Sequence, residues 1–269
     1  MYADLSRPPL DAAAVSRAVV YDGSLWRSLR VVASTGSTNA DLAGAARDGA
    51  REGCVLVAEE QTSGRGRLDR VWTSPAQAGL TFSVLLRPPS DIPVSRWGWL
   101  PLLAGVAVAE AVRGRTGVAT RLKWPNDLLL GEQRRKAAGV LAEVVDDAVV
   151  IGIGLNVSTR AEELPEGATS LTVEGAASAD RDPILRAILR EIESRYRTWC
   201  GALGDAVAGG LLTAYVEVCD TLGREVSVMV PSGGRIGGRA EAIDSTGRLV
   251  IRTGFEVHAM ATGDVTHVR

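Results

Sequence analysis

The stretch CVLVAEEQTSGRGRLDR, residues 54–70, runs from an apolar segment directly into a loop in which glycine and arginine alternate. The valine-rich segment predicts a β-strand. Glycine lets backbone N–H groups approach an anion closely, and arginine presents paired donors that match carboxylate or phosphate oxygens. The stretch therefore places a flexible, cationic loop at the end of a strand, where it suits an anionic ligand.

The loop by itself does not identify that ligand. It lacks both the Gly-Lys-Ser/Thr of a phosphate-binding P-loop and the G-x-G-x-x-G of a dinucleotide site. An RNA-binding Gly-Arg tract would continue further and would interleave aromatic residues. Because an isolated Gly-Arg-Gly-Arg is more often a solvated surface turn, the assignment of a site depends on the rest of the chain.

Around this loop, residues 29–157 alternate short β-rich runs with helical segments, which predicts an α+β domain with helices packed on a sheet. The expected strands are 29–33, 54–60, 81–86, 119–124, 137–145 and 149–157, and the expected helices are 38–50, 97–112, 180–199 and 205–219. Asp182 is the expected N-cap of the third helix. The apolar segment 97–112 reaches Glu110 before it attains the ~20 residues of a membrane span, so it is predicted to be buried.

The residue pattern changes near Thr221. Short alternating strands follow, separated by the glycine turns PSGGRIGG at 231–238 and STGR at 245–248. This pattern predicts a small antiparallel barrel. The expected domains are therefore 1–220 and 221–269.

Composition restricts the setting of the protein. A formal charge of −2 and a pI near 5.8 give no global basic field for nonspecific binding to nucleic acid or anionic lipid. Three cysteines without a C-x-x-C pair and only two histidines argue against structural zinc and for a reduced, cytoplasmic protein. The N-terminal segment lacks the charged head and apolar core of a secretory signal.

Three further motifs carry polar residues at the ends of predicted elements. In TRLKWPNDLLL, Lys123 ends a strand before a Pro-Asn-Asp corner, which brings a cation, an amide and a carboxylate into one turn. In RRKAAGVLAEVV, Lys136 precedes a strand of small residues. In STGSTNADL, Ser37 opens a helix as an N-cap, at an end that also suits a polar or anionic group. Each motif, taken alone, is better explained by local structure than by a binding site.

The order of these motifs is more specific than any one of them. GSTN, QTSGRGR, W-x-S-P, KWPND, RKAAG and GIGLN follow one another over roughly residues 30–160, and this order resembles the biotin protein ligase family. The resemblance implies a class II synthetase-like α+β catalytic domain with a mixed sheet, followed by a small SH3-like barrel. It also implies a ligase that joins biotin to one lysine of the biotin carboxyl carrier domain of a carboxylase such as acetyl-CoA carboxylase.

That reaction has two steps, which consume ATP with Mg²⁺ as the activating ion and no tightly bound metal. Biotin and ATP give biotinyl-5'-adenylate, from which the acceptor lysine takes the biotinyl group. By resemblance, the catalytic residues are Lys136, Arg67, Lys123 and Asp127. The implied biotin-binding residues are Ser37, Thr38, Asn39, Gln61, Arg65, Gly66, Arg67, Lys136, Gly139 and Gly154. The implied ATP and adenylate contacts are Gly64, Arg65, Arg67, Trp72, Lys123, Asn126 and Asn156.

The sequence departs from the family pattern at three positions. Leu68 and Asp69 follow the second arginine where glycine is usual, so Asp69 is expected to stiffen the loop and to add negative charge. Ala137 replaces a bulkier residue after the lysine, which is expected to change packing and not chemistry. The role of Asp127, as a participant or as an orienter of Lys123, stays open.

Two alternatives in function also stay open. A lipoate–protein ligase shares this fold and makes an acyl-adenylate, although GRGR with KWPND favours biotin. A biotin-responsive regulator would need a DNA-binding module, and about 30 residues before the first predicted strand are too few for one, so no specific nucleic-acid partner is expected. No membrane partner is expected. A non-catalytic binding relic is disfavoured by the intact cationic set. The acceptor carboxylase, the magnesium ligands and the oligomeric state are not determined.

Overall fold

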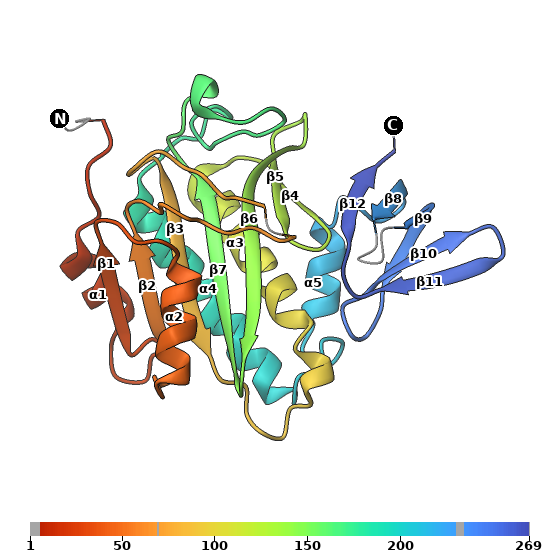
Figure 1. Ribbon diagram of the computed structural model, residues 1–269, viewed down its shortest axis with the longest axis horizontal. Coiled ribbons are helices and arrows are strands. Elements are labelled where there is room, and N and C mark those ends of the chain that lie inside the picture. The colour runs from red at the N-terminus through yellow and green to blue at the C-terminus, as the bar shows by residue number, and fades with distance from the viewer. Residues whose placement is uncertain (1–5, 69, 230–233, 269) are drawn as a thin grey trace.

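A mixed sheet of seven strands forms the main body of the computed structural model, which describes residues 6–68, 70–229 and 234–268 (Figure 1). The strand order is β1-β2-β3-β7-β6-β5-β4, with β1 and β2 parallel and the other neighbours antiparallel. The strands are β1 Ser28–Val32, β2 Cys54–Ala58, β3 Gly79–Leu86, β4 Thr120–Lys123, β5 Asp127–Leu130, β6 Arg135–Val145 and β7 Ala148–Asn156.

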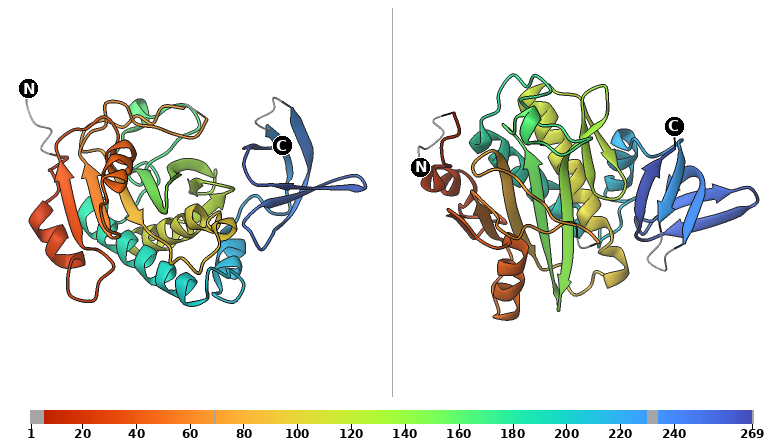
Figure 2. Two further views of the ribbon diagram at one scale, coloured as in Figure 1. Left: turned by 60° about the horizontal axis from the view of Figure 1, so that its bottom comes forward. Right: turned by 45° about the horizontal axis from the view of Figure 1, so that its top comes forward.

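Helices cover both faces of this sheet. They are α1 Ala12–Val19, α2 Thr38–Arg47, α3 Trp99–Thr116, α4 Arg181–Gly201 and α5 Leu211–Val218, with short 3-10 turns at Val94–Arg96 and Ala161–Glu163. Figure 2 shows α3 and α4 side by side against the sheet, while α2 lies on the opposite face in Figure 1. As predicted for residues 97–112, α3 is almost wholly buried. No helix in the described ranges is both long and apolar enough to cross a membrane.

The alternation of side chains along β7 explains why the two faces differ. Ile151, Ile153 and Leu155 belong to the large core that contains α3 and α4. The intervening positions on the other face include Gly152 and Gly154. Successive residues of a strand point to opposite faces, so the period of the sequence GIGLN leaves a strip without side chains on the α2 face.

The C-terminal region is a five-stranded antiparallel sheet in the order β11-β10-β9-β8-β12. The strands are β8 Glu225–Met229, β9 Arg235–Ile243, β10 Leu249–Thr253, β11 Glu256–Met260 and β12 Asp264–His267. The predicted fold class is confirmed. The expected turn at 231–238 is wrong in its second half, because β9 begins at Arg235; residues 230–233 lie outside the described ranges. Gly238 sits within β9, where a Cβ would lie 2.2 Å from the Arg252 carbonyl oxygen.

Two buried tryptophans of the main sheet and helices fasten the C-terminal sheet. Trp99 Nε1 donates to the Ser245 carbonyl at 2.8 Å, and Trp124 Nε1 donates to the Gly247 carbonyl at 3.1 Å. The predicted STGR turn therefore exists and also receives both indole donors. Since an unpaired buried N–H is costly, these bonds fix the C-terminal sheet at one end of the molecule (Figure 2).

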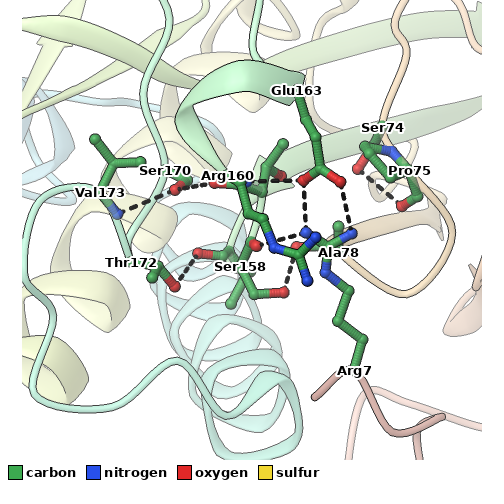
Figure 3. A network of polar contacts seen from close by, with 12 residues as sticks. Arg7, Ser74, Pro75, Ala78, Ser158, Arg160, Glu163, Ser170, Thr172 and Val173 are labelled. Carbon is green, nitrogen blue, oxygen red and sulfur yellow. Dashed lines mark hydrogen bonds and ion pairs between the residues drawn. The ribbon is translucent and has the colours of Figure 1, made fainter. Parts of the chain in front are cut away.

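Two buried arginines hold the segment before α1. Arg7 forms an ion pair with Glu163 and donates to the Ser158 carbonyl at 3.0 Å (Figure 3). Arg181 pairs with Glu59 and donates to the Pro8 carbonyl at 2.6 Å. These contacts tie the segment before α1 to the loop that follows β7 and to the start of α4.

The start of α4 differs from the sequence prediction. Its N-cap is Asp180, whose side chain accepts from the backbone N–H of Asp182. The expectation of Asp182 as the N-cap is therefore wrong by two residues. Both aspartates satisfy the sequence rule for a cap, and only the position of Arg181 on Glu59 decides between them.

Candidate active site

A pocket opens on the α2 face of the sheet, beside the N-terminus of α2. Ser37 is the N-cap of that helix, with its hydroxyl accepting from the backbone N–H of Ala40 at 3.5 Å. The pocket also reaches the glycine–arginine loop and the C-terminal sheet. Its lining residues are Ser37, Thr38, Asn39, Gln61, Arg65, Gly66, Arg67, Leu68, Arg70, Val71, Trp72, Thr81, Phe82, Asn126, Asp127, Lys136, Gly139, Val140, Leu141, Gly152, Ile153, Gly154, Gly263 and Asp264.

A continuous polar network forms one end of the pocket. Gln61 Oε1 accepts from the Thr38 backbone N–H at 2.8 Å and from the Thr38 hydroxyl at 2.9 Å. The Ser83 hydroxyl donates to Asn39 Oδ1 at 2.6 Å and lies 2.7 Å from the Thr38 hydroxyl, whose single proton is shared between Gln61 and Ser83. Asn39 Nδ2 in turn donates to Glu143 Oε2 at 2.7 Å. Because each member is fixed by the next, the network presents preorganised amide and hydroxyl groups to a neutral polar ligand.

The glycine strip of β7 forms the floor of the pocket. A Cβ at Gly152 would lie 2.1 Å from Asn39 Oδ1, and one at Gly154 would lie 2.4 Å from the Trp72 ring. The same ring lies 3.6 Å from the Cβ position of Gly139. Trp72 Nε1 is buried and has no hydrogen-bond partner among the described residues. The glycines therefore let the Trp72 indole and the Asn39 amide lie directly on β7, and the indole gives the pocket an apolar surface that suits the ring or alkyl chain of a ligand.

The glycine–arginine loop folds back on itself above this floor. The Gly66 backbone N–H donates to the Arg70 carbonyl at 2.6 Å, and Arg65 and Val71 form an isolated bridge. Leu68, at the tip, has a positive φ of 54°, a conformation that glycine adopts more readily. The family's usual glycine in this part of the loop is consistent with that geometry. Asp69 lies outside the described residues.

Arg67 is the arginine of the loop that reaches into the structure. Its guanidinium donates to Asn126 Oδ1 at 3.2 Å and to the Thr262 hydroxyl at 2.6 Å. Burial lowers the pKa of Arg67, and the negative charges of Asp127 and Asp264 counteract that effect. An arginine stays protonated in proteins, so Arg67 brings a partly desolvated cation to the pocket.

Lys136 and Asp127 form the cationic end of the pocket. Lys136 Nζ lies 2.6 Å from Asp127 Oδ1, and Asp127 pairs with Gly139 in the β5–β6 register. The backbone of Lys136 is held by the loop after β7, since its N–H donates to the Gly167 carbonyl and its carbonyl accepts from the Thr169 N–H. Both the side chain and the main chain of this lysine are therefore fixed.

Comparison with known proteins identifies the architecture. The biotin/lipoate A/B protein ligase family model matches residues 31–156, and the biotin protein ligase C-terminal domain model matches residues 221–268. The biotin–[acetyl-CoA-carboxylase] ligase of Mycobacterium tuberculosis is 44% identical over 99% of this chain and 98% of its own length. The chain belongs to the biotin protein ligase family. The resemblance drawn from the order of motifs is confirmed.

Other family members agree with this assignment. The bifunctional ligase/repressor BirA of Bacillus subtilis is 34% identical over 87% of this chain and 71% of its own length. The structure of the Aquifex aeolicus biotin protein ligase in complex with biotin and ATP superposes with a TM-score of 0.73 at 30% identity. That superposition covers 91% of this chain and all of the Aquifex chain.

Most residues assigned by the motifs line the pocket of this family member, but three do not. Gly64 is buried beside it, where a Cβ would lie 2.3 Å from the Trp72 carbonyl oxygen. Asn156 is also buried, and its amide donates to the Thr169 carbonyl at 3.0 Å. Lys123 lies in a neighbouring recess. The structure therefore gives Gly64 and Asn156 local structural tasks.

The recess around Lys123 adjoins the ligase pocket and includes residues of the C-terminal sheet. It shares Arg70, Asp127, Lys136 and Asp264 with the pocket. His267 lies within it, and burial, followed by the positive charges of Lys123 and Arg224, lowers the pKa of His267 to about 4 against the opposing charge of Asp220. At neutral pH this histidine is uncharged, and the recess keeps a surplus of cations.

Several residues of the pocket, and of the polar network behind it, were not predicted from the motifs. Ser83 places a hydroxyl in the middle of the apolar run TFSVLL, and that position was the available signal. Glu143 ends a run of small residues in the same way. Arg70 and Asp264 had no local signal in the sequence, because their roles depend on the contact that they form with each other in the folded protein. Within the described ranges, no group of three or more histidine, cysteine, aspartate or glutamate side chains is arranged to hold a metal ion.

Proposed function

We propose that the chain is a biotin–[acetyl-CoA-carboxylase] ligase that uses this pocket for both steps of its reaction. The observation that carries the assignment is the combination, in one pocket, of a preorganised neutral polar end, an apolar glycine floor and a cationic end. Biotin has the same three parts: a ureido head, a ring with an alkyl chain, and a carboxylate. The similarity to the Mycobacterium ligase over the whole chain supports the same reading and disfavours lipoate as the substrate.

In the first step, a biotin carboxylate oxygen attacks the α-phosphorus of ATP, and the bond from the α-phosphorus to the bridging oxygen breaks as pyrophosphate leaves. Two like charges at ~4 Å repel by several kcal/mol in a partly dry site, so cations must already be in place. Lys136 and Arg67 supply them, with Arg65 at the rim, where its guanidinium is 3.9 Å from Glu143. Their contribution is largest when charge is redistributed in the transition state.

Asp127 acts as an orienting residue in this proposal. Its carboxylate holds the ammonium of Lys136 at 2.6 Å, and it stands opposite Lys123 in the β4–β5 register. An aspartate in an ion pair is a weak base, so it is poorly suited to take a proton from the acceptor. We therefore assign Asp127 to positioning Lys136 and leave the acceptor proton to solvent or to the leaving phosphate.

Magnesium enters the site with the triphosphate of ATP. The two carboxylates that line the pocket, Asp127 and Asp264, are both engaged by cations, so they leave little capacity for a dedicated metal cage. Magnesium is commonly bound through substrate phosphates with only one or two carboxylates, which is compatible with this pocket. The bound ion would neutralise phosphate charge, while Lys123 faces the same charge from the recess.

In the second step, the amine of the acceptor lysine attacks the biotinyl carbonyl carbon, AMP leaves with the bonding electron pair, and the amine loses a proton. The adenylate is a mixed anhydride, so water must be kept away until the carrier arrives. The described residues of the loop, 65–68 and 70–71, line the pocket, and we assign to them the exclusion of that water. The acceptor is proposed to be the carrier domain of a biotin-dependent carboxylase.

Pyrophosphate exchange into ATP tests the first step directly. Biotin, and not lipoate, is expected to support exchange, and Lys136→Ala is expected to reduce it at least about a hundredfold. Lys123→Ala is the matched comparison, since it removes a lysine from the recess alone and is expected to raise the KM for ATP more than it lowers kcat. Exchange with lipoate alone, or with neither acid, would contradict the proposal.

A further inference from the structure

The loop of residues 65–71 contacts the turn between β11 and β12 of the C-terminal sheet. Arg67 donates to the Thr262 hydroxyl at 2.6 Å. Arg70 forms a two-pronged contact with Asp264, in which Nη1 donates to Oδ1 and Nη2 to Oδ2. These two residues lie 194 positions apart in the sequence. The loop is therefore joined to the C-terminal sheet at two of its arginines.

The turn that receives these contacts packs closely against β8. Gly263 has a φ of 157°, and a Cβ at this position would lie 2.4 Å from Val228. The backbone thus passes close to β8, and this close approach fixes the flanking residues Thr262 and Asp264. Gly263 and Asp264 also line the pocket itself, so the turn is part of the wall that the ligand meets.

The charges around Asp264 favour its ionised form. Burial alone would raise the pKa of Asp264, but the hydrogen bonds from Arg70 and the positive charges of Arg70, Lys123 and Arg67 outweigh it, and the pKa lies below the ordinary value. The same contact raises the pKa of Arg70. Both shifts favour the charged forms of the two partners, so the ion pair is formed at neutral pH.

Most of the connections between the loop's arginines and the rest of the protein run to the C-terminal turn. On the main domain, Arg67 has its bond to Asn126 at 3.2 Å, and Arg65 stands 3.9 Å from Glu143. An ordinary exposed salt bridge contributes little, but a two-pronged arginine–carboxylate contact fixes geometry as well as charge. Asp264 has a side chain only 32% exposed, which strengthens the contact further.

We propose that Asp264 and Thr262 are positioning residues for the ligation reaction, and that the C-terminal sheet holds the arginine loop closed over the pocket. This inference rests on the proposed function, because it concerns retention of the acyl-adenylate formed there. It makes the C-terminal domain part of the barrier that keeps biotinyl-5'-adenylate in place until the carrier amine arrives. Neither residue touches the reacting atoms.

The test measures release of preformed, radiolabelled biotinyl-5'-adenylate from the full-length enzyme into an excess of unlabelled biotin and ATP. Asp264→Asn is expected to speed release about three- to tenfold, with tenfold corresponding to about 1.4 kcal/mol. Arg70→Gln is expected to give the same increase, and the double variant no further increase. Glu241→Gln is the control, because it breaks the Glu241–Arg252 pair in the same sheet away from the pocket.

The salt dependence of adenylate release distinguishes an ion pair that holds the loop from a purely structural role of Asp264, which salt would not affect. Raising the salt concentration from about 0.05 to about 0.5 M screens exposed charges, so release from the wild type is expected to accelerate towards the rate of Asp264→Asn, which itself changes little. If Asp264→Asn proves unstable, Thr262→Val tests the second contact and is expected to accelerate release by a smaller factor.

Two results would overturn the inference: release from Asp264→Asn within twofold of the wild type, or effects of Asp264→Asn and Arg70→Gln that multiply in the double variant. Failure of the proposed function is recognised separately. In that case the wild type forms no adenylate with biotin and ATP, and no complex is available for release.

Discussion

Replacing Ser83 by alanine tests whether the polar network at the biotin end of the pocket orients the ligand-facing groups. The Ser83 side chain is fully buried, donates to Asn39 Oδ1 at 2.6 Å and shares a 2.7 Å hydrogen bond with the Thr38 hydroxyl. The substitution removes one oxygen atom from the middle of β3 and adds no bulk. Ser83 does not itself line the pocket, so the effect is expected to pass through Asn39 and Thr38, which do.

The expected cost follows from these contacts. Asn39 is only 4% exposed, so its Oδ1 loses a donor that water cannot readily replace. An unsatisfied buried acceptor costs about 1–3 kcal/mol, and we expect the free energy of unfolding to fall by about 2 kcal/mol. If the amide of Asn39 and the hydroxyl of Thr38 then sample several orientations, the KM for biotin should rise about tenfold, equivalent to about 1.4 kcal/mol.

A matched control separates the loss of stability from the loss of orientation. Ser170 is also fully buried and makes two hydrogen bonds, to the Thr159 carbonyl at 2.6 Å and from the Val173 N–H at 3.2 Å, outside the pocket (Figure 3). Urea unfolding should show similar losses for Ser83→Ala and Ser170→Ala. Biotin-dependent pyrophosphate exchange should show the raised KM for Ser83→Ala alone. Equal KM values for the two variants would refute the orienting role of the network.

Three more changes test other parts of the site. Gly154→Ala places a methyl group 2.4 Å from the Trp72 ring and should raise the KM for biotin at least about tenfold while costing about 1–3 kcal/mol of stability; Gly114→Ala, with open space around it, should do neither. Asp127→Asn should lower the kcat of pyrophosphate exchange about ten- to a hundredfold through a misplaced catalytic lysine, and an unchanged kcat would exclude the orienting role. The pKa of His267 is lowered from 6.5 to about 4 in the folded protein. As the pH falls, His267 is therefore protonated in the unfolded chain before it is protonated in the folded one, and the free energy of unfolding should fall by up to about 3 kcal/mol between pH 6.5 and 4. Urea titrations across that range should show a flatter profile for His267→Asn.

The sequence predicted the elements whose periodicity is strong and local. Most runs of the main sheet lie where alternation placed them, and short antiparallel strands follow residue 221 as expected, although β9 begins at Arg235, inside the expected turn. The predictions failed where a contact between residues distant in the sequence selected one of several possible local conformations. Gly238 has the composition of a turn, but the close approach of the Arg252 carbonyl gives it a strand position. The short helix α1 was not predicted, although Asp11 is its N-cap and Val15 and Val19 form its buried side.

The site was predictable to the extent that its residues cluster in motifs. Residue type and position were enough to predict the loop arginines, Lys136 and the N-terminus of α2 as parts of the site. Ser83 was predictable in principle, as a hydroxyl in the middle of an apolar strand. Asp264 was not, because a single aspartate after a glycine has no distinguishing pattern until folding brings it to Arg70. A residue that a second domain contributes to the site cannot be found from the local sequence pattern around it.

The position of Trp72 gives the protein a built-in optical reporter. Of the six tryptophans, all in the described part of the chain, Trp26, Trp97, Trp99, Trp124 and Trp199 are buried in the core. Trp72 is the half-buried one, and it stands over the glycine strip of β7. The emission of the five core indoles is shielded from events at the surface, so a change in intrinsic fluorescence on adding a ligand reports on the pocket without any label.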